Sequence, residues 1–210
     1  SDALAGGIMQ EGHQCGMLWG ASLAIGAEAY RTCENLNQAR QVDVAATQKV
    51  MRSFEEREGT INCRTITNCD FHSKASFAKY MLTGRYRHCF ELAQQWAPEA
   101  VRAAREGMKS ENDGCGDSCL SCATEVARKM GASEEEMSMV AGFAGGLGLS
   151  GAGCGALATA IWFKSLEWCR EEDGSSIKNP YSKKILDTFY KATNSEINCE
   201  KITGRKFNYL

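Results

Sequence analysis

The chain has 210 residues, and its 24 Lys and Arg against 26 Asp and Glu give a formal net charge of -2. This near-neutral balance gives no reason to expect a nucleic acid or an anionic membrane surface as partner. A hydrophobic content of 43% allows a buried core, and only 2 prolines among plentiful Ala, Gly, Glu and Met favour helices joined by glycine-rich turns. The length fits one large domain or two halves of roughly 100 residues each.

The first half shows several stretches with the apolar spacing of helices. We predict helices over about residues 13–35 and 42–57, a short helix that carries Cys63, and a helix from about Arg87 that carries Cys89. Residues 71–87 mix polar and aromatic types, and we predict no helix there. Pro98 is predicted either to open a helix turn or to kink a helix. Residues 109–116, with Ser, Glu, Asn, Asp and Gly, form the predicted linker.

Helix signals are clearer in the second half. We predict a helix over about residues 119–130, a capping box at Ser133 with Glu136, a helix from Cys154 to about Arg170, a helix begun by Asn179 and Pro180, and a last short helix around Cys199 capped by Ser195. No segment alternates like a strand over a useful length. The fold class expected is therefore all-α.

Residues 137–163 carry no charge and are long enough to suggest a membrane span. Seven glycines make this stretch a poor continuous helix, so we expect a helix end, a glycine turn and a second helix, all buried in protein. No transmembrane segment is expected, and no signal peptide is visible in this numbering. The cytoplasm is the default compartment, with export as the alternative if a signal precedes Ser1.

A cysteine-centred block occurs twice. GGIMQEGHQCGMLWGA (6–21) and GGLGLSGAGCGALATA (145–160) are identical at 7 of 16 positions, at a constant offset of 139. At an offset of 136, Cys33 then pairs with Cys169, and the INCxxIT motif around Cys63 pairs with the one around Cys199. We therefore predict two tandem repeats, 1–109 and 110–210, in a helical bundle that forms a pseudo-dimer. The first repeat lacks a cysteine helix before its turn, so residues are expected to precede Ser1.

Eleven cysteines cannot all pair within one chain, and a chain of this length needs no disulfides to fold. Metal or redox use is the better interpretation. Cys15 and Cys154 follow glycine turns at predicted helix starts, where free backbone N–H groups lower a thiol pKa and can donate to cluster sulfurs. Because both repeats keep Cys15, Cys63, Cys154 and Cys199, these four are preferred as functional over buried inert thiols.

Two further groups of cysteines are local. Cys115, Cys119 and Cys122 would share one helix face, either as ligands of one centre or as surface thiols that oxidise by accident. Cys63 with Cys69 and Cys89 could form a matching set. Core packing is the better interpretation for Cys33 and Cys169. His13 is a weaker ligand candidate, because its counterpart is Ala152.

These motifs resemble the C-GCAxxG-C-C family of bacterial and archaeal redox-active proteins. The turn motif corresponds to residues 15–20 and 154–159, with Met17 in place of alanine and Thr159 in place of glycine. The third cysteine corresponds to Cys63 and Cys199. The family's first cysteine would be Cys119 or Cys122 in the second repeat and is missing from the first, whereas its fourth would be Cys89 in the first repeat and is missing from the second. The resemblance covers nearly the whole chain.

The resemblance implies an all-helical fold and a redox role with an iron–sulfur centre, [2Fe-2S] in preference to [4Fe-4S]. Covalent haem is not supported, because the chain has no Cys-x-x-Cys-His. The candidate ligands are the cysteines at 15, 63, 69, 89, 115, 119, 122, 154 and 199, which would bind one or two clusters. We further expect at least one site to draw ligands from both repeats, because Cys89 and the 115–122 cluster flank the linker.

The first functional hypothesis is an electron carrier, or a redox subunit of a larger complex or homodimer, that acts with redox protein partners rather than as a stand-alone enzyme. The second is a thiol–disulfide oxidoreductase that uses Cys119 and Cys122 as a C-x-x-C pair. The third is a structural helical protein, held by zinc or disulfides, that binds a partner.

Overall fold

The computed structural model describes residues 2–109, 121–171 and 179–207. These residues form helices and turns with no strand, and their only β-type pairing is two isolated bridges. The predicted all-α class is confirmed. None of the helices in these ranges is both long enough and apolar enough to cross a membrane.

The first half contains a 3-10 turn and five α-helices: η1 (Asp2–Leu4), α1 (Gly16–Thr32), α2 (Leu36–Glu58), α3 (Cys63–Thr67), α4 (Lys74–Leu82) and α5 (Tyr86–Met108). Helix α2 begins before the predicted residue 42, because the Asn35 side chain accepts a hydrogen bond from the Gln38 N–H and caps it. Helix α4 was not predicted. Pro98 lies inside α5 rather than at a helix start.

The second half contains α6 (Cys122–Lys129), α7 (Glu134–Met139), η2 (Ala141–Phe143), α8 (Gly155–Glu171), α9 (Pro180–Ala192) and α10 (Cys199–Thr203). The capping box at Ser133 and the Asn179 cap are confirmed. The prediction that Ser195 caps the last helix is wrong. Asn198 directly precedes α10, whereas Ser195 has a φ of +62° in the turn before it.

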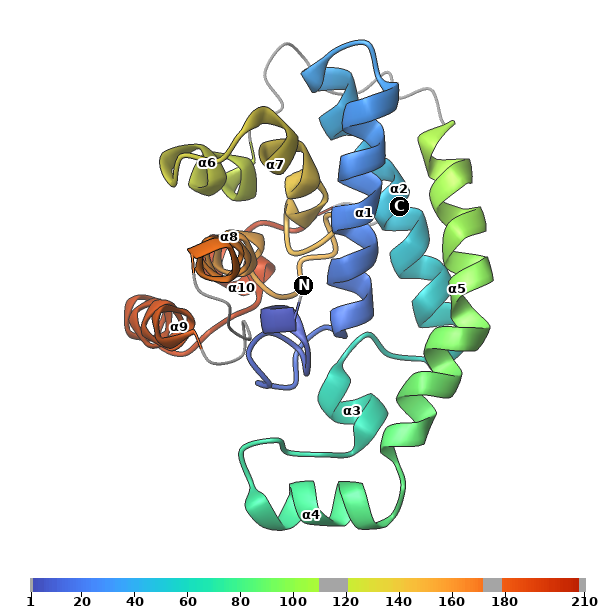
Figure 1. Ribbon diagram of the computed structural model, residues 1–210, viewed down its shortest axis with the longest axis vertical. Coiled ribbons are helices and arrows are strands. Elements are labelled where there is room, and N and C mark those ends of the chain that lie inside the picture. The colour runs from blue at the N-terminus through green and yellow to red at the C-terminus, as the bar shows by residue number, and fades with distance from the viewer. Residues whose placement is uncertain (1, 110–120, 172–178, 208–210) are drawn as a thin grey trace.

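Figure 1 shows two groups of helices on either side of a central seam. Helices α1, α2 and α5 pack side by side in one group, and α6 to α10 form the other, while α3 and α4 extend the first group at its lower end. The two 3-10 turns cross the seam, since η1 packs on α8 and η2 packs on α1 and α2. The halves therefore interlock through their turns.

The core is continuous across the seam. Trp19 of α1 and Phe143 of η2, both fully buried, meet edge to face with ring centroids 4.7 Å apart. Asp43 is fully buried in α2, and its carboxylate accepts a hydrogen bond of 2.5 Å from the Gly142 N–H. Trp96 and Trp162 are also buried. Apolar and polar contacts together fix one half against the other.

Candidate functional site

Two left-handed turns precede the cysteines that open α1 and α8. All residues from 6 to 10 have φ between +54° and +82°, and all residues from 145 to 149 have φ between +56° and +85°. The hydrogen bonds repeat as well: the Gly12 N–H donates to the Gly6 carbonyl at 2.9 Å, and the Gly151 N–H donates to the Gly145 carbonyl at 2.8 Å. The internal repeat is thus a repeat of backbone conformation.

Glycine is required in these turns by close backbone contact as well as by φ. A Cβ on Gly7 would lie 2.3 Å from the His13 backbone nitrogen, and one on Gly146 would lie 2.6 Å from that of Ala152. The glycine after the cysteine has the same explanation, since a Cβ on Gly155 would overlap the Phe143 carbonyl oxygen. Left-handed backbone costs non-glycine residues about 1–2 kcal/mol each, so these turns are strained structures of the kind found at functional sites.

Each turn holds its cysteine beside the cysteine of the INC motif. In the first half the Cys15 N–H donates to the Ile61 carbonyl at 2.8 Å, and the Cys63 N–H donates to the His13 carbonyl at 2.7 Å. In the second half the Cys154 and Cys199 N–H groups make the equivalent bonds at 2.8 and 2.6 Å. The structure therefore brings together the two cysteine pairs that the repeat singled out.

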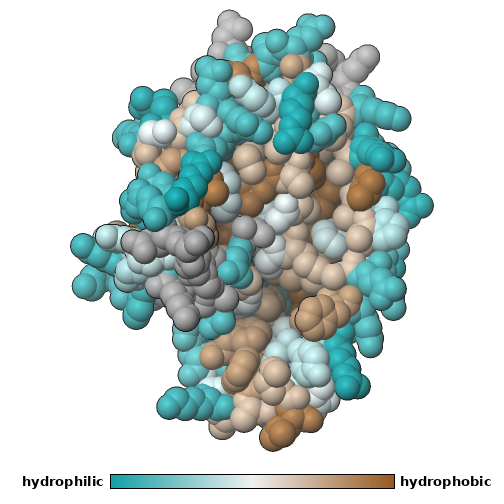
Figure 2. Space-filling model, in the orientation of Figure 1, coloured by the Kyte–Doolittle hydropathy of each residue, from teal (hydrophilic) through white to brown (hydrophobic). Residues whose placement is uncertain are grey.

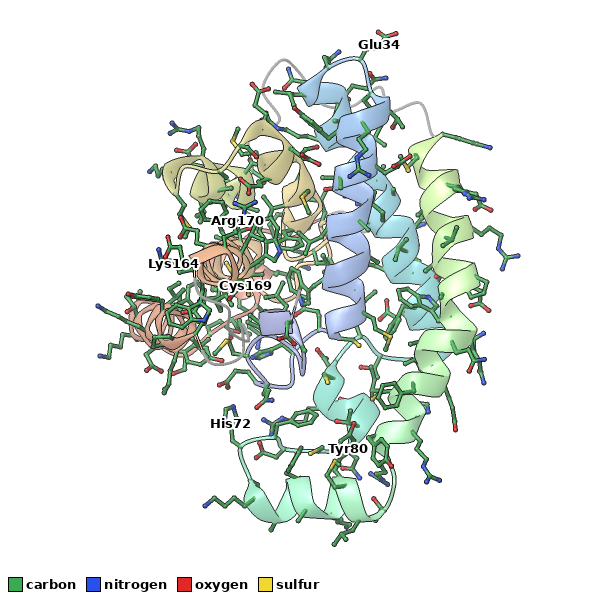
Figure 3. All side chains as sticks on the ribbon, viewed as in Figure 1. Glu34, His72, Tyr80, Lys164, Cys169 and Arg170 are labelled. Carbon is green, nitrogen blue, oxygen red and sulfur yellow. The ribbon has the colours of Figure 1, made fainter. Side chains whose placement is uncertain are left out.

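The first thiol set is Cys15, Cys63, Cys69 and Cys89. Three of these thiols are buried and that of Cys89 is half-buried. They lie close enough together that a negative charge on any of the other three sulfurs raises the pKa of Cys63. Two polar side chains line the set: the Tyr80 hydroxyl lies 3.6 Å from the Cys89 sulfur, and the Ser76 hydroxyl donates to the Cys69 sulfur at 3.8 Å. Figure 3 shows Tyr80 between α4 and the helices above it.

Burial holds the thiols of Cys15 and Cys63 protonated by raising the pKa of each. Burial raises the pKa of Cys63 to about 12, and the charges of Cys15, Cys89 and Cys69 add to the effect. Burial likewise raises the pKa of Cys15 to about 11, although the Met17 N–H donates to its sulfur and opposes the shift. No basic side chain is among the groups that shift either pKa. Thiolates here would need a positive group, such as a metal centre, to compensate them.

The second thiol set is Cys122, Cys154 and Cys199. Burial raises the pKa of Cys199 to about 11, and the charges of Cys154 and Cys122 raise it further. The pKa of Cys154 is also raised by burial, against N–H donation from Leu157 and Ala156. Cys122 is exposed at the first position of α6. The predicted ligands Cys115 and Cys119 lie outside the described residues.

The two sets remain separate where the structure describes them. Every cysteine that shifts the pKa of Cys63 belongs to the first half, and every one that shifts the pKa of Cys199 belongs to the second. This arrangement counts against the expected site with ligands from both repeats. The prediction that Cys169 packs in the core is wrong, because this residue is exposed on α8. It lies far from Tyr80 of the first thiol set in the view of Figure 3. Cys33 is half-buried against Ala29, Ala39 and Val42, as expected.

Sequence reasoning missed three side chains at these sites. Tyr80 and Ser76 lie on α4, which was not predicted. Gln14 is only 1% exposed, and neither atom of its amide group has a hydrogen-bond partner among the described residues. Its oxygen would lie 2.3 Å from a Cβ on Gly153, so the amide reaches the turn of the other half beside Cys154. The repeat alignment contained a signal for this residue: Gln14 aligns with Gly153, so a long polar side chain in one repeat stands where the other repeat has none.

The donor chemistry of the two sets fits an iron–sulfur group. Among the described residues, no three His, Cys, Asp or Glu side chains are arranged to hold a single metal ion. A cluster joins its cysteines through several irons and bridging sulfides and so spans a wider group of thiolates than one ion does. An unpaired buried amide costs about 1–3 kcal/mol. The N–H of the Gln14 amide could donate a hydrogen bond to a sulfur atom of such a group.

Comparison with protein families gave one match. The family model described as "Putative redox-active protein (C_GCAxxG_C_C)" matches the chain twice, over residues 1–127 and 114–209. The two matches confirm the tandem duplication. No curated protein and no solved structure matched the chain. The predicted boundary between residues 109 and 110 stays a prediction.

Proposed function

Because the chain belongs to the C-GCAxxG-C-C family of redox-active proteins, we propose that it is an iron–sulfur electron-transfer protein or the redox subunit of a larger complex. Its ligands would be Cys15, Cys63, Cys69 and Cys89 in the first half, and Cys122, Cys154 and Cys199 with Cys119 or Cys115 in the second. We favour [2Fe-2S] over [4Fe-4S] and one or two clusters per chain. Redox proteins are the expected partners.

The observation that carries this proposal is the duplicated pairing of a turn cysteine with an INC cysteine. In both halves the same two backbone hydrogen bonds hold the two residues side by side, and both members of each pair have a raised pKa. Thiols held protonated are weak nucleophiles, which argues against thiol exchange by these four residues. A bound cluster would supply reversible one-electron chemistry.

The protein's own residues would position and insulate such a group. Buried Cys15 and Cys63 exclude water from one side of the first set, and low solvent exposure is one of the factors that sets a cluster's reduction potential. The Tyr80 hydroxyl can donate to the Cys89 sulfur, and the Met17 N–H donates to the Cys15 sulfur. Such hydrogen bonds stabilise the additional negative charge of a reduced centre.

Anaerobic iron and acid-labile sulfide analysis, with absorption and EPR spectra, tests the proposal. Cys15→Ser and Cys154→Ser should each remove the iron and the spectrum of one set. Cys33→Ser and Cys169→Ser are matched controls, because these two residues are equivalent in the repeats and belong to neither thiol set; they should retain full iron. Wild-type protein with no iron or sulfide after anaerobic preparation would refute the proposal, and stoichiometric zinc would favour the structural alternative.

A thiol–disulfide oxidoreductase remains the second candidate because of Cys122. This residue is exposed at the first position of α6, directly after the Ser121 cap, where an incoming disulfide can reach its sulfur. Its partner would be Cys119. Dithiol-dependent disulfide reduction that is lost in Cys119→Ser, in protein without iron, would establish this function.

A further inference from the structure

The corner between α4 and α5, residues 71–90, carries a group of large exposed apolar side chains. Leu82 is 88% exposed, Phe90 is 70% exposed, and Met81 and Phe77 are each nearly half exposed. Figure 2 shows this apolar surface at the lower end of the molecule, with hydrophilic side chains on both sides of it. Grouped apolar residues with a polar rim are typical of interaction surfaces.

The charge of this α4–α5 corner differs from that of the chain. Its twenty residues contain four basic side chains, Lys74, Lys79, Arg85 and Arg87, and no Asp or Glu, although the whole chain has a net charge of -2. All four are exposed, and within the described residues none lies in an ion pair. The positive charge is therefore free to meet an acidic surface.

Aromatic side chains connect this surface to the first thiol set. Exposed Phe77 lies 6.3 Å from buried Tyr80 between ring centroids, and the Tyr80 hydroxyl lies 3.6 Å from the Cys89 sulfur. The Cys69 sulfur accepts a hydrogen bond from the hydroxyl of Ser76, which lies on α4 with Phe77 and Tyr80. A partner seated on the corner would therefore be separated from the thiols by a single layer of side chains.

We propose that the α4–α5 corner is the docking surface for an acidic redox protein, which exchanges one electron with the group held by the first thiol set. This inference rests on the proposed function. The reduced partner would lose one electron and the oxidised centre would gain it, or the reverse, with no bond formed. A small apolar centre within a charged rim suits the brief encounters of electron-transfer proteins, whose interfaces are at the small end of the range.

An acidic flavodoxin serves as the probe. Its hydroquinone should reduce the iron-loaded protein in stopped-flow measurements at a second-order rate that falls steeply between 20 and 300 mM salt. The double variant Lys79→Glu with Arg85→Glu should lower the low-salt rate at least tenfold, with iron content unchanged. Lys184→Glu reverses an exposed charge on α9 and is the control, expected to stay within twofold of wild type.

Three results would overturn the docking proposal while leaving the cluster intact. The first is an unchanged rate in the double variant. The second is charge-dependent co-sedimentation of the corner with phosphatidylglycerol vesicles without an effect on the flavodoxin rate. The third is self-association through the corner in sedimentation velocity. If the wild type holds no iron, the proposed function fails instead, and calorimetric titration with the same flavodoxin still tests whether the corner binds an acidic protein.

Discussion

The two halves of the molecule share a cysteine turn but differ in what surrounds it. In the first half α3 is followed by a short connection that carries Cys69, and then by α4 and α5, which carry Tyr80 and Cys89. In the second half α10 is the last described helix, and the additional cysteine comes from α6, before the turn. The duplicated part fixes two thiols, and the part that is not duplicated decides how each site is completed and what can approach it.

The largest expected effect tests whether the turns are equivalent. Gly7→Ala and Gly146→Ala should each lower the free energy of unfolding by about 3–5 kcal/mol, because a left-handed φ and backbone overlap combine. Gly59→Ala and Gly131→Ala are controls, since both glycines have positive φ but no atom within 4 Å of the added Cβ. These controls should lose only about 1–2 kcal/mol in denaturant unfolding. Equal losses at all four positions would contradict the close-approach argument.

The second prediction concerns the contact that joins the halves. Asp43→Ala should cost about 2–3 kcal/mol, because the buried Gly142 N–H would lose its acceptor. Asp43→Asn keeps an acceptor oxygen of the same size and should cost less. Denaturant unfolding measures both. A loss in Asp43→Asn as large as in Asp43→Ala would mean that the hydrogen bond to Gly142 is not the stabilising feature.

Gln14 tests the asymmetry at the seam. In protein without metal, Gln14→Met should raise the free energy of unfolding by about 1 kcal/mol, because it removes two unpaired buried polar atoms. In iron-loaded protein the same change should shift the reduction potential of the centre held by the second thiol set, because the Gln14 amide lies beside Cys154. The potential of the other centre should stay unchanged. A redox titration followed by EPR measures both potentials. A variant that is destabilised without metal and has unshifted potentials would contradict the role assigned to this amide.

The last prediction is a pH dependence. The folded protein holds the proton of Cys63 more tightly than the unfolded chain, because its pKa is about 12 in the fold against about 8.5 when unfolded. Stability of the metal-free protein should therefore be full below about pH 8.5 and decrease as pH rises towards 12. Cys63→Ala should show a smaller decrease between pH 8 and 10 in thermal unfolding than wild type or Cys169→Ala. An identical slope in Cys63→Ala would remove the basis for this prediction.

Local signals predicted much of the fold. Capping residues such as Ser133 and Asn179, and the glycines after α2 and α10, mark helix ends through short-range hydrogen bonds and φ values that a sequence reveals. Helix α4 was missed because its exposed apolar residues break the spacing of an amphipathic helix. Ser195 was mistaken for a cap, but it lies in a left-handed turn where its N–H donates to the Tyr190 carbonyl at 2.8 Å.

The candidate site was predictable as far as the repeat extends. Cys15, Cys63, Cys154 and Cys199 occur in matched motifs, and backbone pairing places them together. Cys69 and Cys89 were named only as a possible set with Cys63, because α4, which lies between them in the chain, was not predicted. The separation of the two thiol sets also depends on long-range packing, because neighbours along the chain at the linker need not be neighbours in space.

The crossing of the two 3-10 turns has a consequence for the history of this architecture. Each turn is covered by helices of the other half, and Leu4 of η1 and Phe143 of η2 are completely buried there. A polypeptide with a single copy of the module would leave these side chains in water unless a second chain covered them. The tandem chain thus has the geometry of a two-fold dimer whose subunits became covalently linked. Once linked, one copy could lose or gain peripheral helices without the other following.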